Sequence, residues 1–166
     1  MAVLTRIDGK EWLQIYQSLP IPGKLAQPHI DDNLFASLQW MGKDSVTRTL
    51  RTHWALTVDN HEVSFLQSYF LSEKVLRLRG LCTKSEYQGK GHMKTLIGLV
   101  LKEYQGKAEE VVCFAGDPGL SVCEAVGFQL DLEFQARFVE YLSSSKHEWK
   151  QDDTSKIYLL RKKLLS

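Results

Sequence analysis

The sequence has few cysteines, and none of them is spaced for a metal or redox site. Cys82, Cys113 and Cys123 are three in number, an odd count, and no CxxC or CxH pattern joins them. An odd, scattered set argues against a disulfide framework and against a cysteine-based zinc site. We therefore expect three free thiols and no bound metal.

An excess of charge and a long apolar run are also absent. The chain carries 21 Lys and Arg against 20 Asp and Glu, a net charge of +1, so nucleic acid, an anionic membrane or a polyacidic partner is not indicated. The longest apolar run, around Leu96 to Leu101, is far shorter than the roughly 20 residues that cross a bilayer. The first residues lack the apolar core of a signal peptide. These features predict a cytoplasmic protein without a membrane segment.

No repeat, low-complexity tract or Pro/Gly/Ser-rich linker divides the 166 residues, of which 43% are hydrophobic and 25% charged. That length and composition can supply one sizeable core. We expect a single domain over residues 1–166.

Two helices are predicted in the first part of the chain. Asp8 and Glu11 have the spacing of a capping box, and apolar residues follow at helical period from Trp12 until Pro20. After an irregular stretch, residues 31–41 restart a helical pattern behind Asp31 or Asp32 as its N-cap. Helices are thus expected before strands.

Three strands should follow. Residues 53–59 and 62–72 are rich in β-branched and aromatic residues around a turn, which predicts an antiparallel hairpin. Residues 74–83 predict a third strand in which Gly80 suits a bulge. By alternation, Arg77 and Arg79 share a face with Leu81. Either this face meets an open acceptor groove, which would favour an anionic acceptor, or the arginines pair with acids on a neighbouring strand.

The remaining elements complete a mixed α/β (α+β) fold. The pattern predicts a helix over 92–104, a buried strand over 109–116, a short helix capped by Asp117, and last strands over 128–142 and 155–165. The predicted order is ααββ, then βαβα, then ββ. A helix joins strands 74–83 and 109–116, so these strands should be parallel neighbours. The apolar final strand could be an inner strand or the edge of a homodimer.

A glycine turn lies where the third strand passes into the helix over 92–104. Gly89 and Gly91 remove side chains beside the free N–H groups of the helix start, an arrangement suited to a phosphate. The alternative is a tight connection without a ligand. The dinucleotide fingerprint fails because Lys94 stands where its third glycine is required, and the Walker A pattern fails at Gln88 and Met93.

A third pattern fits. The stretch TKSEYQGKGHM resembles the acyl-CoA pyrophosphate loop, [Arg/Gln]-x-x-Gly-x-[Gly/Ala], of the GCN5-related N-acetyltransferase (GNAT) family, with Gln88 first and Gly91 as its second glycine. The last motif position is Met93. PGLSVCEAVGF is similar to the later helix of the family, and SKIYLLRKKLL to its closing strand. The resemblance implies a GNAT-like fold and direct transfer of an acyl group from acetyl-CoA, or another acyl-CoA, to an amine on a small molecule or a protein.

The resemblance also implies site residues. The main chain at Leu81, Cys82 and Thr83 would pair with pantetheine as a further strand does, and an N–H near Leu81 or Cys82 would face the oxyanion. The pyrophosphate would be wrapped by the turn residues Gln88, Gly89, Lys90, Gly91, His92 and Met93.

Cys123 stands at the position of the family's common tyrosine, which implies a role as the acid for the leaving thiolate. A thiol with a pKa of about 8.5 is suited to that step. The alternative is a small buried residue on a helix face.

No general base is identified. Glu86 lies in the predicted turn, and His53 and His61 flank the predicted hairpin, positions that are typical of surface residues. Trp40, Trp54 and Trp149 suit either a core or a stacking surface. A second hypothesis is a non-catalytic domain of the same fold that binds CoA or a protein partner, which Met93 and Cys123 favour.

Overall fold

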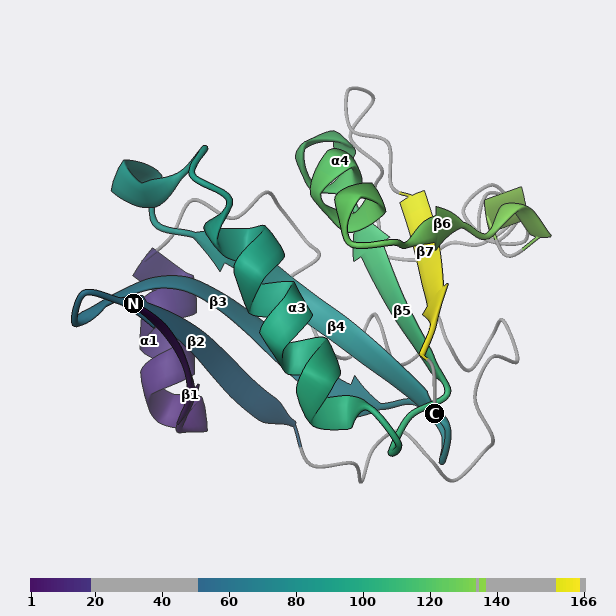
Figure 1. Ribbon diagram of the computed structural model, residues 1–166, viewed down its shortest axis with the longest axis horizontal. Helices are drawn as coiled ribbons and strands as arrows, with labels where there is room; N and C mark the ends of the chain where they lie inside the picture. The colour runs from purple at the N-terminus through teal and green to yellow at the C-terminus, as the bar shows by residue number, and fades with distance from the viewer. Residues whose placement is uncertain (19–50, 134, 137–157, 165–166) are drawn as a thin grey trace.

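The computed structural model describes residues 1–18, 51–133, 135–136 and 158–164. They form a seven-stranded mixed sheet in the order β1-β2-β3-β4-β5-β7-β6 (Figure 1). Its strands are β1 (Ala2–Ile7), β2 (Thr52–Val58), β3 (His61–Phe70), β4 (Val75–Thr83), β5 (Glu110–Ala115), β6 (Gln129–Leu130) and β7 (Tyr158–Lys163). Its helices are α1 (Gly9–Ser18), the 3-10 turn η2 (Ser85–Tyr87), α3 (His92–Tyr104) and α4 (Asp117–Ala125).

The predicted fold class and most predicted elements are confirmed. The hairpin β2–β3 is antiparallel, and β4 and β5 are parallel neighbours in register from Val75 opposite Glu110 to Leu78 opposite Cys113. Strand β7 pairs with both β5 and β6, so it is an inner strand. The predicted helix over 31–41, Trp40 and Trp149 lie outside the described residues. Among the described residues, no helix has the length and apolar character needed to span a membrane.

The sequence predicted helices before strands, and this order is wrong because the chain begins with the strand β1. This six-residue edge strand pairs antiparallel with β2 over its whole length, from Ala2 opposite Val58 to Ile7 opposite His53. Its residues are mostly exposed or half-buried, so it has no clear apolar alternation. The pairing joins residues about fifty positions apart and therefore depends on the tertiary structure.

The strand predicted over 128–142 is also wrong in its length. Among the residues of this range that the structure describes, Gln129–Leu130 is a strand and residues 132–133 and 135–136 are helical. The N–H of Gln135 donates to the carbonyl of Asp131 at 2.8 Å. A short apolar alternation does not by itself separate a strand from a helix turn. Here Gln135 Oε1 accepts from the N–H of Leu159 at 2.7 Å, so a side chain takes the place beside β7 that the main chain of a longer β6 would have.

The start of α1 confirms half of the predicted capping box. Asp8 Oδ1 accepts from the N–H of Glu11 at 2.8 Å. The Glu11 carboxylate instead lies near that of Glu62 on β3. Burial and the Glu11 carboxylate raise the pKa of Glu62, and Lys84 opposes this shift. For α4, Gly116 is the N-cap residue, whereas the sequence predicted Asp117.

The main core lies between the sheet and α3. Four residues of α3, Leu96, Ile97, Val100 and Leu101, pack with apolar side chains of β2 to β5. Trp54 belongs to this core, and its Nε1 donates to Ser68 Oγ at 2.8 Å. Ser68 Oγ in turn lies 2.7 Å from the Tyr104 hydroxyl. This buried chain fixes the C-terminal end of α3 to β3, while α1 covers the opposite face of the sheet (Figure 1).

Candidate functional site

The glycine turn lies at the carboxyl edge of the parallel pair β4 and β5. Pairing of the two strands ends at Leu78 and Cys113, although β4 continues to Thr83 and β5 to Ala115. The two ribbons diverge toward the edge where η2 and α4 lie (Figure 1). The two strands thus part beyond Leu78, two residues before Gly80. From Arg79 onward, β4 has a described strand partner on its β3 side only.

A bulge at Gly80 shapes this free part of β4. Gly80 has φ 66°, a conformation that glycine adopts without steric cost. The register with β3 shifts there: Gln67 faces Arg79, whereas Phe65 faces Cys82. One extra residue on β4 reverses the alternation.

The reversal corrects the predicted faces of β4. Leu81 packs against the core under α3, and Ser64 Oγ lies 2.8 Å from Thr83 Oγ1. Leu81 therefore shares the α3 face with Leu76 and Leu78, and it does not share the face of Arg77 and Arg79. The predicted pantetheine residues Leu81, Cys82 and Thr83 are half-buried.

The turn itself has its N–H groups available. Gly91, with φ 78°, is the N-cap residue of α3, and Gly89 has φ 77°. Within the described chain, the first helical bond comes from the N–H of Thr95 to the carbonyl of Gly91 at 3.1 Å, and no described group accepts from the N–H groups of residues 89–94. Such amides, with the helix dipole behind them, attract an anion.

Open space lies above both glycines. A Cβ placed on Gly89 or Gly91 would have no neighbour within 4 Å among the residues that the structure describes. Glycine is therefore explained here by the positive φ of both residues and not by crowding from the described chain. The described residues leave the space beside these amides open. The geometry at this position suits a phosphate group.

The other predicted loop residues hold or flank the turn. Gln88 Nε2 donates to the carbonyl of Thr83 at 3.1 Å, which ties the turn to the end of β4. Met93 packs against the core under α3 and so points away from the open space. Lys90 is exposed, with Nζ 5.9 Å from the centre of the Tyr87 ring. His92 is half-buried, and its ring centre is 6.4 Å from that of Tyr87.

Cys123 lies at the point where β4 and β5 part. Its side chain is 0% exposed and lies beside the thiol of Cys113, the last residue of β5 that pairs with β4. The neighbouring Cys113 thiol lowers the pKa of Cys123, against the effect of burial, whereas the interaction with Cys123 and burial raise the pKa of Cys113. The burial agrees with the alternative role of Cys123 as a small core residue.

The remaining candidate residues differ in how deeply they are buried. Burial raises the pKa of Cys82 to about 12, so this thiol is not a nucleophile at neutral pH. Glu86 and His61 are exposed, as predicted. His53 is not a surface histidine: it is half-buried on β2, and its Nε2 lies 2.9 Å from Gln67 Nε2. No sequence spacing links His53 to Gln67, because the strand register brings them together.

Arg77 and Arg79 are 2% and 5% exposed on the face of the sheet that α1 covers. Arg77 Nη1 donates to the Tyr69 hydroxyl, and its guanidinium lies 5.3 Å from the centre of the Phe114 ring. Arg79 Nη1 donates to Gln67 Oε1 at 3.4 Å. The predicted pairing with a neighbouring strand is present, but the partners on β3 are a hydroxyl and an amide oxygen.

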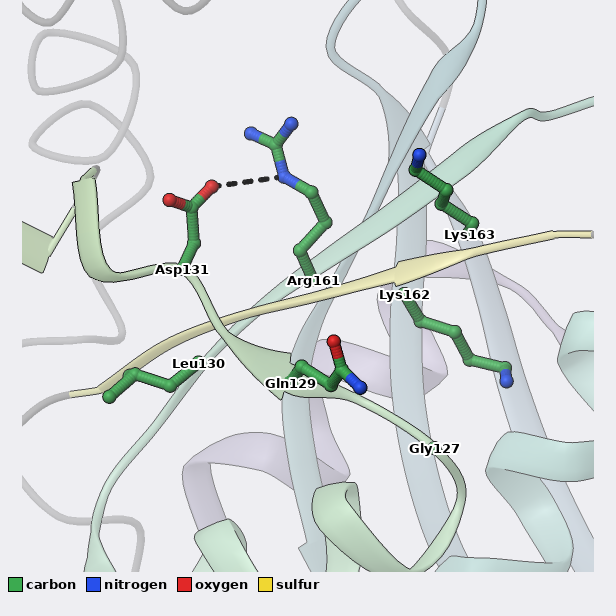
Figure 2. Close-up of a pocket in the computed structure, with 7 residues that line it drawn as sticks. All are labelled: Gly127, Gln129, Leu130, Asp131, Arg161, Lys162 and Lys163. Atoms are coloured by element: carbon green, nitrogen blue, oxygen red, sulfur yellow. Dashed lines mark ion pairs between the residues drawn. The ribbon is translucent and has the colours of Figure 1, made fainter.

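A separate hollow of about 450 Å³ lies beside β6 and β7, the last two strands in the order of the sheet (Figure 2). Its lining residues are Gly127, Gln129, Leu130, Asp131, Arg161, Lys162 and Lys163. Arg161 is held by Asp131 at 3.2 Å and by Glu110 at 2.9 Å. This hollow does not include the glycine turn.

Solved structures share this arrangement of elements. No model of a protein family matches the sequence, and no curated protein sequence matches it either. A GNAT family acetyltransferase from Elizabethkingia anophelis, solved with acetyl-CoA bound, matches with a TM-score of 0.58 at 12% identity over 98% of both chains. The chain has the GNAT acetyltransferase fold.

Two further acetyltransferase structures are similar to this chain. The ribosomal-protein-S18-alanine N-acetyltransferase of Escherichia coli has a TM-score of 0.60 at 12% identity, over 99% of this chain and 94% of that one. The spermidine/spermine N-acetyltransferase of Vibrio cholerae has a TM-score of 0.60 at 11% identity, over 98% of this chain and 95% of that one. Their names give an alanine of ribosomal protein S18 and spermidine or spermine as acceptors, so the fold alone does not select an acceptor.

Proposed function

We propose that this chain is an acyl-CoA-dependent N-acetyltransferase that uses acetyl-CoA and acts by direct transfer to an amine. The observation that carries the proposal is the set of N–H groups at residues 89–94 for which the described chain offers no acceptor, beside two glycines that have no described atom within 4 Å of an added Cβ. These groups follow the end of β4, which beyond Leu78 has a described strand partner on its β3 side only. A diphosphate fits the first feature and an extended pantetheine fits the second. The likeness to a GNAT structure that holds acetyl-CoA supports the same ligand.

In the proposed reaction, the neutral acceptor amine attacks the thioester carbonyl carbon. The carbonyl oxygen gains negative charge and accepts a hydrogen bond from the main chain next to the bulge, at Leu81 or Cys82. The new C–N bond forms, the C–S bond breaks, and the thiolate of CoA leaves. The amine loses one proton and the thiolate gains one, so the products are an amide and free CoA.

The proposal is tested by binding and turnover together. Acetyl-CoA at 100 times its Kd should stabilise the protein by ~2.7 kcal/mol, which for a chain of this size raises Tm by ~5–10 °C. Release of free thiol is then measured over a panel of amines that includes polyamines and peptides with a free N-terminus. Absence of a thermal shift would contradict the proposal. A shift without thiol release from any amine would favour the alternative of a non-catalytic CoA-binding domain.

We propose Cys123 as the proton donor to the leaving thiolate, because its thiol lies against the last paired residue of β5 and has a lowered pKa. Cys123→Ala should lower kcat by ~100-fold and leave the KM for acetyl-CoA unchanged, as loss of a general acid does. Cys113→Ala empties the same region and keeps the Cys123 thiol, but it also removes the neighbour that lowers the pKa of Cys123, so its kcat should fall less than that of Cys123→Ala. Equal kcat values for Cys123→Ala and wild type would contradict this role and leave the core role.

A further inference from the structure

Three polar side chains form a row across the face of the sheet that α1 covers. His53 on β2 faces Gln67 on β3, and Gln67 faces Arg79 on β4. Gln67 Oε1 accepts from Arg79 Nη1 at 3.4 Å and from Arg51 Nη1 at 3.1 Å. Gln67 Nε2 lies 2.9 Å from His53 Nε2. The Gln67 side chain is 4% exposed, so its hydrogen bonds replace those to water.

The two guanidinium groups determine which way the Gln67 amide points. A guanidinium has donors only, so the atom facing Arg51 and Arg79 must be the oxygen. The amide nitrogen, which also has donors only, is then left facing His53. The ring Nε2 must therefore accept, which makes His53 neutral with its hydrogen on Nδ1.

The surroundings of His53 favour the same neutral form. Its ring centre is 5.1 Å from that of Trp12 on α1. Burial and then Arg51 lower the pKa of His53, and Asp8, next to α1, opposes them. Protonation would place the Nε2 hydrogen against the amide hydrogens of Gln67. Rotating the amide would relieve this contact only by turning its N–H groups toward the two arginines.

The row ends at the bulge of β4. Gln67 and Arg79 are the last register pair before the shift, and Gly80 with its positive φ follows directly. The Gln67–Arg79 bond thus holds one side of the bulge, and Phe65 facing Cys82 holds the other. The row connects β2 to the segment whose main chain would face the thioester oxygen.

We propose that Gln67 is a positioning residue: its amide, oriented by Arg51 and Arg79, fixes the neutral Nδ1–H form of His53 and holds the Gly80 bulge in place. The expected effect of Gln67 on kcat rests on the proposed acetyl transfer, whereas the expected Nδ1–H form of the His53 ring does not. Protonation of His53 at low pH breaks the row and displaces the bulge.

The ring form is measured directly by ¹⁵N NMR of the histidine side chains, with the His53 signals assigned by their loss in His53→Gln. In the wild type, the Nδ1–H form is expected. Gln67→Glu places a carboxylate against Nε2, so the hydrogen should move to Nε2 and the pKa of His53 should rise. This variant keeps an acceptor for both arginines, so it is expected to fold even where Gln67→Leu does not. An Nε2–H form in the wild type, or an unchanged ring in Gln67→Glu, would overturn the proposal.

Kinetics then test the link to the bulge. Gln67→Glu should remove the acid limb that protonation of His53 causes in the kcat profile, because a carboxylate accepts from Nε2–H in both forms of the ring. Gln67→Leu should lower kcat by up to about 100-fold, as a small misplacement of the reacting groups does. The KM for acetyl-CoA should stay the same in Gln67→Glu, which keeps the bulge in place, and should rise in Gln67→Leu, because Leu81, Cys82 and Thr83 follow the bulge. An unchanged pH profile together with the expected ring form would refute the positioning role. A wild type without acyl transfer but with the expected ring form would contradict the proposed function and leave the ring assignment standing.

Discussion

Gly91→Val is expected to weaken acetyl-CoA binding by roughly 100-fold, the loss of about 3 kcal/mol of charge-assisted hydrogen bonds from the main chain. Gly91 is the N-cap residue of α3 with φ 78°, and the space above it is open. A branched side chain would fill the space that the phosphate needs and would favour a different φ. Isothermal titration calorimetry with acetyl-CoA measures the change in Kd.

Gly106→Val is the matched control for this substitution. Gly106 lies just beyond the other end of α3, also has a positive φ, of 82°, and also has no neighbour within 4 Å of an added Cβ. Both variants should lose about 1–2 kcal/mol of stability from the unfavourable φ. Only Gly91→Val should lose affinity, because only that end of the helix presents free N–H groups. Equal affinity in the two variants would refute the assignment of the turn to the diphosphate.

Ile97→Ala is expected to lower the free energy of unfolding by ~2–5 kcal/mol, the cost of deleting a large buried side chain and leaving a cavity. Ile97 is 0% exposed and lies in the core between α3 and the sheet. For a chain of this size the loss corresponds to a fall in Tm of roughly 5–15 °C. Urea unfolding followed by circular dichroism gives the free energy directly.

Lys102→Ala on the exposed side of the same helix is the control, with an expected effect within about 0.5 kcal/mol. At a temperature where Ile97→Ala remains folded, its affinity for acetyl-CoA should equal that of the wild type, since Ile97 faces the core and not the turn. A loss of stability below about 1 kcal/mol for Ile97→Ala would mean that α3 does not pack on the sheet through this face.

The two substitutions separate the two tasks of α3. Its apolar side fixes the helix to β2–β5, and its N-terminus presents the glycine turn at the edge where β4 and β5 part. Ile97→Ala should change stability and leave the affinity of the folded protein for acetyl-CoA unchanged. Gly91→Val should change affinity far more than its Gly106 counterpart does.

Local signals in the sequence were sufficient for the central unit. The period of Leu96, Ile97, Val100 and Leu101 predicts α3 with the buried face that the structure has. The compact apolar segment after it predicts β5, and the crossover predicts that β5 runs parallel to β4. Positive φ at Gly89 and Gly91 follows from the same reasoning, because glycine is the residue that adopts it without strain. These features depend on residues close together in the chain.

The sequence by itself determined the parallel strand pair, the helix between them and the glycine turn, since periodicity and backbone conformation are local properties. Only the tertiary structure decided the rest: the pairing of β1 with β2, the turn from β6 into a helix, the reversal of faces at Gly80, and the contact of Gln67 with His53 and Arg79. Each of these depends on which residue of a neighbouring strand lies opposite. That register is set by packing between segments distant in the chain, and a one-residue shift in it moves every side chain to the other face.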